Sequence, residues 1–190
     1  MLPFDFQREG IALRAFELAD VPALWSYLND PALEGCRHLP DGFPDLAPLS
    51  SRRVEAAIEL WQKEEKGWTL AVTDAATTEL LGHIHAGWEW DPHCPSASVV
   101  IAPARQRRGV GSAALEMAVG YLFLETPAHV VSGWTASWND AALAFAVRNR
   151  FHEAGRRPRA GVRGGAFTSD VAFDLLRSEW EAAGRRLHGT

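Results

Sequence analysis

The sequence predicts an α/β protein, of the α+β type, in which a mixed sheet of about seven strands carries helices on both faces. Segments that alternate apolar and polar residues, or that are rich in β-branched residues, are interspersed with segments whose apolar residues recur every three or four positions. Their order is strand, two helices, three strands, helix, strand, helix and two strands. Polar turns and proline- or glycine-rich stretches separate them.

Length and composition fit a single globular domain, which we expect to span residues 1–190. A chain of 190 residues can bury a sizeable core, and its 47% hydrophobic and 23% charged residues are ordinary for a soluble protein. The net charge of −5 argues against nucleic-acid or membrane binding by the whole surface, although a local basic patch remains open. No apolar run is long enough to span a membrane, and the first residues do not resemble a signal peptide. The cysteines Cys36 and Cys94 are isolated, so we expect a cytoplasmic protein without disulfides or a zinc site.

The first third of the chain predicts a strand, two helices and an irregular loop. Residues 11–16 alternate weakly, as in a strand, and Asp20 followed by Pro22 is typical of a helix N-terminus. A second helix is indicated by the apolar positions Val54, Ala57, Ile58 and Trp61. Between the helices, residues 35–50 are rich in proline and glycine, which suits either a binding loop over an acceptor pocket or a plain surface connection.

The remaining elements follow from alternation and turn residues. Residues 68–72 and 80–85 flank a polar turn and predict an antiparallel hairpin whose second strand continues toward Trp90. Residues 98–101 predict a buried strand. The C-terminal part predicts a strand at 129–134, a helix capped by Asn139, and two strands near 151–157 and 167–175.

A phosphate-binding turn is predicted between the 98–101 strand and the next helix, which is indicated by Val110, Ala114, Met117, Tyr121 and Leu124. A helix N-terminus offers unpaired N–H groups and a partial positive charge. Glycines let that backbone come close to an anion, and arginines add full charge. The alternative is a plain connection between a strand and a helix. The residues of the turn are Gln106, Arg107, Arg108, Gly109, Val110, Gly111 and Ser112.

Titratable residues gather on one predicted strand face. Two-residue spacing places His83, His85 and Glu89 on the same face of the strand that runs toward Trp90. A metal site is not expected, because a third ligand at convincing spacing is missing. The residues are better candidates for acid–base chemistry, and the alternative is an ordinary core or solvated face.

Several motifs resemble the GNAT superfamily of acyl-CoA-dependent N-acyltransferases. Residues 106–112 are similar to its Gln/Arg-x-x-Gly-x-Gly/Ala signature, which holds the coenzyme A pyrophosphate, and the order of elements is that of the GNAT fold with its mixed, mostly antiparallel sheet. Other stretches resemble the ribosomal-protein N-terminal (RimJ/RimL-like) acetyltransferase branch. They are Leu13-Arg14-Ala15-Phe16 with Asp20, Ile101-Ala102-Pro103, Asn139 with Arg148-Asn149-Arg150-Phe151, and Leu175-Leu176-Arg177-Ser178-Glu179-Trp180.

The resemblance implies a transferase, an N-acetyltransferase that uses acetyl-CoA as acetyl donor and a primary amine as acceptor. The pantetheine arm would bind the backbone of Val99, Val100 and Ile101. Asn139 would either contact the pantetheine or serve only as a helix cap. The acceptor stays open between a protein N-terminus, an aminoglycoside, a polyamine and an amino acid, and a homodimer is allowed for.

Three departures from the family pattern make the acid–base chemistry uncertain. The helix after Asn139 carries no hydroxyl over residues 141–146, where relatives place a tyrosine or serine. Ser96 stands near the position of a common glutamate. Arg150 replaces a usual glycine, so Asn149 is predicted to take the left-handed conformation at the helix end.

The predicted general base is Glu89, with His85 as second choice. Two alternatives to an active enzyme remain: a CoA-binding module with impaired catalysis, and a ribosome- or RNA-associated protein. The second rests on a run of arginines, Arg156, Arg157, Arg159 and Arg163, with Arg148 and Arg150 nearby.

Overall fold

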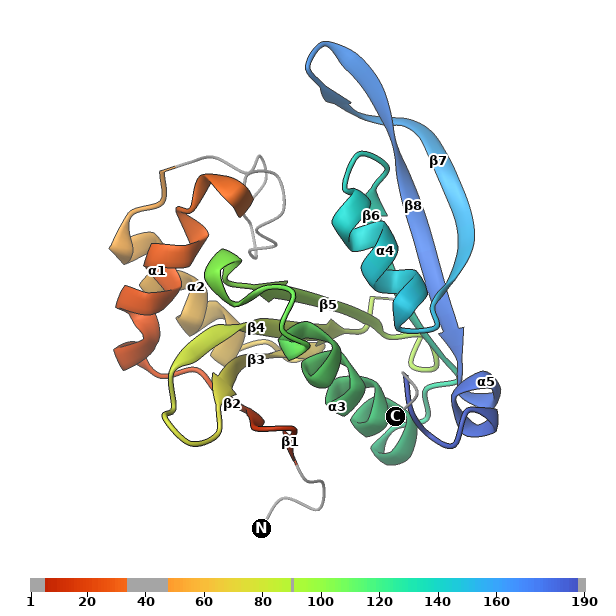
Figure 1. Ribbon diagram of the computed structural model, residues 1–190, viewed down its shortest axis with the longest axis horizontal. Coiled ribbons are helices and arrows are strands. Elements are labelled where there is room, and N and C mark those ends of the chain that lie inside the picture. Colours follow the sequence, from red (N-terminus) through yellow and green to blue (C-terminus); the bar gives the residue numbers. More distant parts are fainter. Residues whose placement is uncertain (1–5, 34–47, 90, 188–190) are drawn as a thin grey trace. The chain divides into compact units, whose positions relative to one another are not determined.

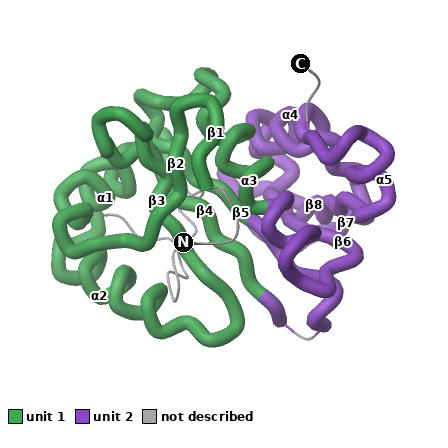
Figure 2. Tube along the Cα trace, turned by 90° about the horizontal axis from the view of Figure 1, so that it is seen from below, with its two compact units in different colours: residues 1–87, 98–118 green, residues 88–97, 119–190 purple. Residues whose placement is uncertain are grey.

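The computed structural model describes residues 6–33, 48–89 and 91–187, which fall into two compact units (Figure 2). Unit 1 comprises Met1–Gly87 and Ser98–Ala118, and unit 2 comprises Trp88–Ala97 and Val119–Thr190. Residues 34–47 lie outside the described residues, and they include most of the loop predicted at residues 35–50. Trp90 also lies outside the described residues.

Unit 1 is built on an antiparallel sheet with helices on both faces (Figure 1). The two-residue strand β1 pairs with β2, β2 with β3, and β3 with β4. The β3–β4 hairpin forms as predicted, because Asp74 Oδ1 accepts hydrogen bonds from the N–H groups of Ala76 and Thr77 and closes the turn. The bounds in this unit are β1 Gln7–Arg8, β2 Ile11–Ala15, α1 Val21–Leu28, α2 Ser51–Gln62, β3 Gly67–Asp74 and β4 Leu80–Gly87, followed by most of β5, Ser96–Ile101, and the start of α3, Val110–Glu125.

The core of unit 1 lies where α1 and α2 cover one face of the sheet. Leu24 and Leu28 of α1 and Val54 and Ile58 of α2 are completely buried there, so the predicted apolar face of α2 is confirmed. Each such side chain contributes about 1.5–3 kcal/mol relative to an exposed one. Ser50 caps α2 by accepting a hydrogen bond from the N–H of Arg53.

Asp20 has a different role from the helix cap that the sequence predicted. It precedes α1, but its side chain makes no cap hydrogen bond and forms two 2.7 Å bonds with the Arg14 guanidinium. The N–H of Glu17 donates a third bond to this carboxylate. Burial by itself would raise the pKa of Asp20, yet these hydrogen bonds outweigh it and leave the pKa below the ordinary value.

Unit 2 contains the C-terminal strands and the helices α4 and α5. β6 pairs with β8, and β7 and β8 form a long hairpin that extends beyond α4 within this unit (Figure 1). The hairpin strands are longer than the predicted segments 151–157 and 167–175. The Arg177 guanidinium fixes the start of α5 by donating to the carbonyl groups of Thr126 and Ala128. The bounds are β6 Val130–Ala136, α4 Asp140–Arg148, β7 His152–Arg163, β8 Ala166–Leu176 and α5 Arg177–Ala182.

The strands are hydrogen-bonded in the order β1-β2-β3-β4-β5-β6-β8-β7, and β5 pairs with β6 in parallel at Ser96 and Ser132. The mixed, mostly antiparallel α/β sheet is therefore confirmed, with eight strands against about seven predicted. The helix α3 starts between Gly109 and Gly111 as predicted. The predicted apolar stripe of α3 is wrong at Leu124, whose side chain is 46% exposed. Residues 113–120 are buried on every side of the helix, so burial in α3 does not follow a single stripe.

Candidate active site

The strand β5 approaches β4 closely, which fixes the start of the predicted phosphate-binding turn. A Cβ added at Gly82 of β4 would stand 2.3 Å from the carbonyl oxygen of Val100, so only glycine fits at this position. The N–H of Ala102 donates to the carbonyl of Leu81, and Gln106 Nε2 donates to the carbonyl of Ile101 at 2.9 Å. Val100 and Ile101 are buried, and Val99 is half-buried.

The turn itself contains two residues in the left-handed region. After a 3-10 turn at Pro103–Arg105, Arg107 has φ +59° and Gly109 has φ +82°. Glycine adopts such a conformation without strain, but arginine does not. Val110, the first residue of α3, is buried and anchors the helix start. The left-handed turn therefore aims the N-terminus of α3 out of the core.

Backbone N–H groups are left without helical acceptors at this N-terminus. Ala113 is the first residue of α3 whose N–H bonds back along the chain, to the carbonyl of Gly109 at 3.0 Å. The N–H groups of Val110, Gly111 and Ser112 precede it, as at any helix start. Added to the helix dipole, they make this end attractive to an anion.

Two positive charges stand at the same end of α3. Arg107 and Arg108 are exposed, and in the part of the chain that the structure describes neither forms an ion pair. The neighbouring Arg105, by contrast, is paired with Glu79. A cation near a helix N-terminus is unfavourable by about 0.3–1 kcal/mol. Two unpaired arginines at this position suit a ligand of high negative charge.

Ser98 is a polar residue of β5 that the sequence analysis passed over. Its Oγ is buried, and none of the described residues offers it a hydrogen-bond partner. An orphaned hydroxyl of this kind costs about 1–3 kcal/mol unless a ligand or water satisfies it. Ser98 directly precedes Val99, so this hydroxyl lies next to the segment of β5 that is predicted to bind pantetheine.

Asn139 lies in unit 2 and acts as the N-cap of α4, since its Oδ1 accepts a hydrogen bond from the N–H of Ala142 at 3.1 Å. The capping prediction is confirmed, and a ligand contact stays a prediction. At the other end of α4, Arg150 takes the left-handed conformation with φ +66°, whereas Asn149 has φ −91°. The prediction for Asn149 is therefore wrong. Asn149 is fully buried and donates from Nδ2 to the Phe145 carbonyl, which leaves Arg150 as the exposed residue that turns the chain.

His83 and His85 lie on β4 of unit 1, with their side chains on one face as predicted. His83 is 1% exposed and bonds through Nδ1 to Tyr27 Oη at 2.7 Å, in contact with the Trp61 ring. Burial raises the pKa of Tyr27 well above its ordinary value, and the charge of Asp20 adds to the effect. His83 is thus a packed core histidine in the α1–α2 face of the sheet.

His85 contacts Thr69 and a residue that the sequence analysis missed, Glu64. His85 Nδ1 lies 3.0 Å from Thr69 Oγ1 and 3.6 Å from Glu64 Oε2, and both side chains of the ion pair are only partly exposed. Burial lowers the pKa of His85 and raises the pKa of Glu64. At neutral pH the imidazole is neutral, as a proton acceptor must be.

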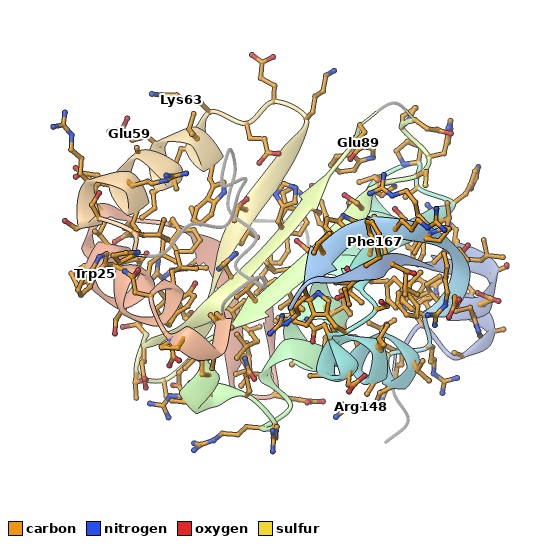
Figure 3. All side chains as sticks on the ribbon, turned by 90° about the horizontal axis from the view of Figure 1, so that it is seen from above. Trp25, Glu59, Lys63, Glu89, Arg148 and Phe167 are labelled. Atoms are coloured by element: carbon orange, nitrogen blue, oxygen red, sulfur yellow. The ribbon has the colours of Figure 1, made fainter. Side chains whose placement is uncertain are left out.

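Glu89 does not lie on the strand face to which the sequence assigned it. β4 ends at Gly87, and Glu89 follows in an exposed bend that belongs to unit 2 (Figure 3). The two-residue spacing therefore carries no information beyond Gly87. His85, the turn residues 106–112 and Val99, Val100 and Ile101 all belong to unit 1, while Glu89 and Asn139 belong to unit 2.

The arginine run is largely paired within unit 2. Arg156 bonds to Glu153 in a bidentate geometry, Arg157 pairs with Asp170, and the Arg163 guanidinium lies 3.6 Å above the centre of the Trp138 ring. These contacts reduce the charge that the run presents to a phosphate backbone.

Among the described residues, no group of three or more histidine, cysteine or acidic side chains could hold a metal ion. No helix in these parts of the chain combines the length and apolar character needed to cross a membrane.

Comparison with known proteins assigns the fold. The family model of the acetyltransferase (GNAT) domain matches residues 11–152. A GNAT-family acetyltransferase from Bacillus anthracis has a similar structure, with a TM-score of 0.79 at 17% identity, covering 92% of this chain and 99% of that one. None of the curated proteins matches the sequence.

Two further solved structures are similar over most of their length. A GCN5-related N-acetyltransferase from Brucella melitensis has a TM-score of 0.77 at 17% identity, covering 95% of this chain and 81% of that one. A spermidine N-acetyltransferase from Vibrio cholerae, solved with CoA and spermine, has a TM-score of 0.76 at 18% identity, covering 92% and 99%. At these identities the likeness concerns the fold.

The mixed sheet, with a left-handed turn between the strand β5 and the helix α3, is the fold that this chain shares with the solved acetyltransferases. Within that class, the chain belongs to the GNAT acetyltransferase family, whose domain model covers most of its length. Members of this family use acetyl-CoA.

The left-handed conformation of Arg107 leads to a stability prediction. Arg107→Gly should raise the free energy of unfolding by about 0.5–1 kcal/mol in the absence of ligand, because it removes backbone strain and a cation beside the helix N-terminus. Urea denaturation measures the change. Arg108→Gly is the matched control, since Arg108 has a negative φ and its replacement removes the same charge without relieving strain. Equal gains in both variants would contradict the role of strain.

Proposed function

We propose that this protein is an N-acetyltransferase that moves the acetyl group of acetyl-CoA to a primary amine. The observation that carries the proposal is the N-terminus of α3, where unpaired N–H groups meet two unpaired arginines in a chain of the GNAT family. CoA carries several phosphate charges, so it matches the surplus positive charge at this point. We further propose that the whole chain, residues 1–190, acts as one domain in the cytoplasm.

Each part of CoA has candidate contacts. Gln106, Arg107, Arg108, Gly109, Val110, Gly111 and Ser112 would hold the pyrophosphate. The backbone of Val99, Val100 and Ile101 would bind the pantetheine arm. The side chains of this strand can pack in the protein while its backbone N–H and C=O groups form hydrogen bonds with the ligand. Asn139 is the further proposed contact in unit 2.

The acceptor is proposed as a primary amine, with two classes in view. The resemblance to the RimJ/RimL-like branch favours the N-terminus of a protein, and the structural likeness to a spermidine acetyltransferase favours a polyamine. The net charge of −5 suits either cationic acceptor. A homodimer stays a prediction.

His85 is the better supported of the two proposed bases. Its lowered pKa keeps the ring neutral at physiological pH, and it lies in the same unit as the phosphate-binding turn. Glu89 is exposed beyond the end of β4, where water stabilises its charge. We therefore place His85 before Glu89, in the reverse of the order that the sequence suggested.

The proposed activity is tested by mixing the protein with acetyl-CoA and a panel of amines. The panel contains a peptide with a free N-terminus, a polyamine, an aminoglycoside and an amino acid. Release of the CoA thiol above the hydrolysis rate with at least one amine is the expected result. CoA binding without transfer to any of them would favour the alternative, an impaired CoA-binding module that lacks a hydroxyl on α4.

CoA affinity should depend on Gly111. Gly111→Val places a branched side chain in the first turn of α3 and should weaken CoA binding by about 2 kcal/mol, the loss expected for charge-assisted hydrogen bonds. Calorimetric titration measures the affinity. Gly155→Val is the control, because an added Cβ there has no neighbour within 4 Å. Unchanged affinity in a folded Gly111→Val variant would refute the phosphate site.

The two candidate bases make opposite kinetic predictions. His85→Gln should lower kcat by about 10²-fold, the low end for general base catalysis, with partial recovery at high pH where more of the amine is neutral. Glu89→Gln should leave kcat within about twofold, because its carboxylate is solvated. A large loss in Glu89→Gln with normal activity in His85→Gln would reverse the assignment.

A further inference from the structure

Glu64, Thr69 and His85 form a polar cluster at one end of the β3–β4 hairpin. Thr69 and His85 face each other across the two strands, with Oγ1 and Nδ1 3.0 Å apart. Glu64 comes from the connection between α2 and β3, and its Oε2 lies 3.6 Å from the same nitrogen. A hydroxyl thus lies within hydrogen-bond distance of Nδ1 and a carboxylate lies just beyond it, and both groups can accept a hydrogen bond.

Two glycines leave room for this cluster. Gly67 and Gly87 pair with each other in the β3–β4 register. A Cβ at Gly67 would stand 2.6 Å from Glu64 Oε1, and a Cβ at Gly87 would stand 2.9 Å from His85 Nε2. Glycine weakens a strand by about 0.5–1 kcal/mol relative to alanine. At these positions it allows the carboxylate and the imidazole to lie against the backbone.

His85 is the basic partner of Glu64. Among the described residues, no lysine or arginine pairs with it, although burial raises its pKa. The described titratable groups on this face of the sheet also include His83, two residues along β4, its hydrogen-bond partner Tyr27, and the Arg14–Asp20 pair beyond them. Thr69, from β3, carries no charge. A proton placed on His85 would therefore be stabilised by the carboxylate of Glu64.

His85, the member of the cluster on β4, lies on the strand next to β5. Since β4 and β5 are neighbours and the N–H of Ala102 bonds to the carbonyl of Leu81, continuing this antiparallel register places Ser98 opposite His85. Ser98 carries the orphaned buried hydroxyl. The residues that follow it are the proposed pantetheine strand. His85 and the proposed pantetheine strand thus lie on neighbouring strands of unit 1.

We propose that Glu64 is a positioning residue for His85, whose carboxylate charge beside Nδ1 stabilises the protonated ring while Nε2 takes a proton from the acceptor ammonium. The inference rests on the proposed acetyl transfer. The ammonium gives one proton to His85 and becomes a neutral amine, which forms a bond to the acetyl carbon as the carbon–sulfur bond breaks. The second proton of the amine goes to the departing thiolate, and His85 returns its proton to solvent. The products are the N-acetylated amine, CoA thiol and one proton.

The direction of the pH effect follows from the charge on Glu64. The base must be neutral, so kcat/KM falls as the pH drops through the pKa of His85. Glu64→Gln removes the charge that stabilises the imidazolium, so the pKa of His85 falls further. The acidic limb of the profile should then move down by about one pH unit. A base of lower pKa is also weaker, so kcat at neutral pH should fall by a factor of about 3, as expected for a base that is one pKa unit weaker.

The test compares Glu64→Gln with Glu65→Gln, an exposed glutamate in the same connection. The pH profile of kcat/KM is recorded for both, and the His85 ring is titrated by NMR in each. In Glu64→Gln we expect the shifted limb, the lower NMR pKa and an unchanged KM for acetyl-CoA. In Glu65→Gln we expect the wild-type values.

The outcomes separate this inference from the proposed function. A Glu64→Gln enzyme with wild-type profile and His85 titration would overturn the role of Glu64 and leave acetyl transfer intact. An NMR shift in a protein that acetylates no amine would refute the proposed function while showing that Glu64 controls His85. A loss of rate with an unmoved limb would make Glu64 a structural residue and also overturn the inference.

Discussion

The contact between β4 and β5 at Gly82 is the constraint on which the rest of unit 1 depends. With no side chain at this position, the Val100 carbonyl can approach to a distance that any Cβ would forbid. The strand held there ends in the turn that starts α3, and the same register extends toward His85 on β4. One missing side chain therefore sets the close approach of β5 to the strand that carries the candidate base. Because the β4–β5 contact is a backbone pairing, the spacing of these two strands is fixed by backbone geometry.

The sequence could predict the parts of this fold that depend on local periodicity and turn chemistry. The β3–β4 hairpin, the buried face of α2 and the start of α3 between two glycines all follow from short-range patterns. Glu89 was misplaced because alternation does not reveal where a strand ends, and β4 stops at Gly87. Glu64 was missed for a different reason. Its contact with His85 joins residues 64 and 85 through the packing of a connection against a sheet, and no spacing rule covers that.

Which arginines of this protein can bind an anion depends on whether they already pair with acidic or aromatic side chains, and much less on the net charge. The six arginines from 148 to 163 suggested a nucleic-acid surface, yet Glu153, Asp170 and the Trp138 ring occupy three of them. Arg107 and Arg108 are fewer but have no acidic partner among the described residues, and they stand where a helix dipole already attracts anions. The smaller cluster is consequently the better anion site. A count of charges along the sequence does not distinguish the two, because it does not show which arginines are paired.

The chemistry of the proposed reaction explains why a base matters more here than an acid. A thiol has a pKa of about 8.5, so a thiolate can leave without prior protonation, whereas an alkylamine of pKa about 10 is almost entirely protonated at pH 7. A helix α4 without a hydroxyl therefore removes a group that the reaction can do without. Loss of the base would leave only the small neutral fraction of amine to react. The arrangement of unit 1 matches this requirement, since His85 is kept neutral by burial and has a carboxylate beside Nδ1 to stabilise the proton once it arrives. In the proposed reaction, His85 and Glu64 would thus serve the proton that must be removed, while the proton for the thiolate would come from the amine itself.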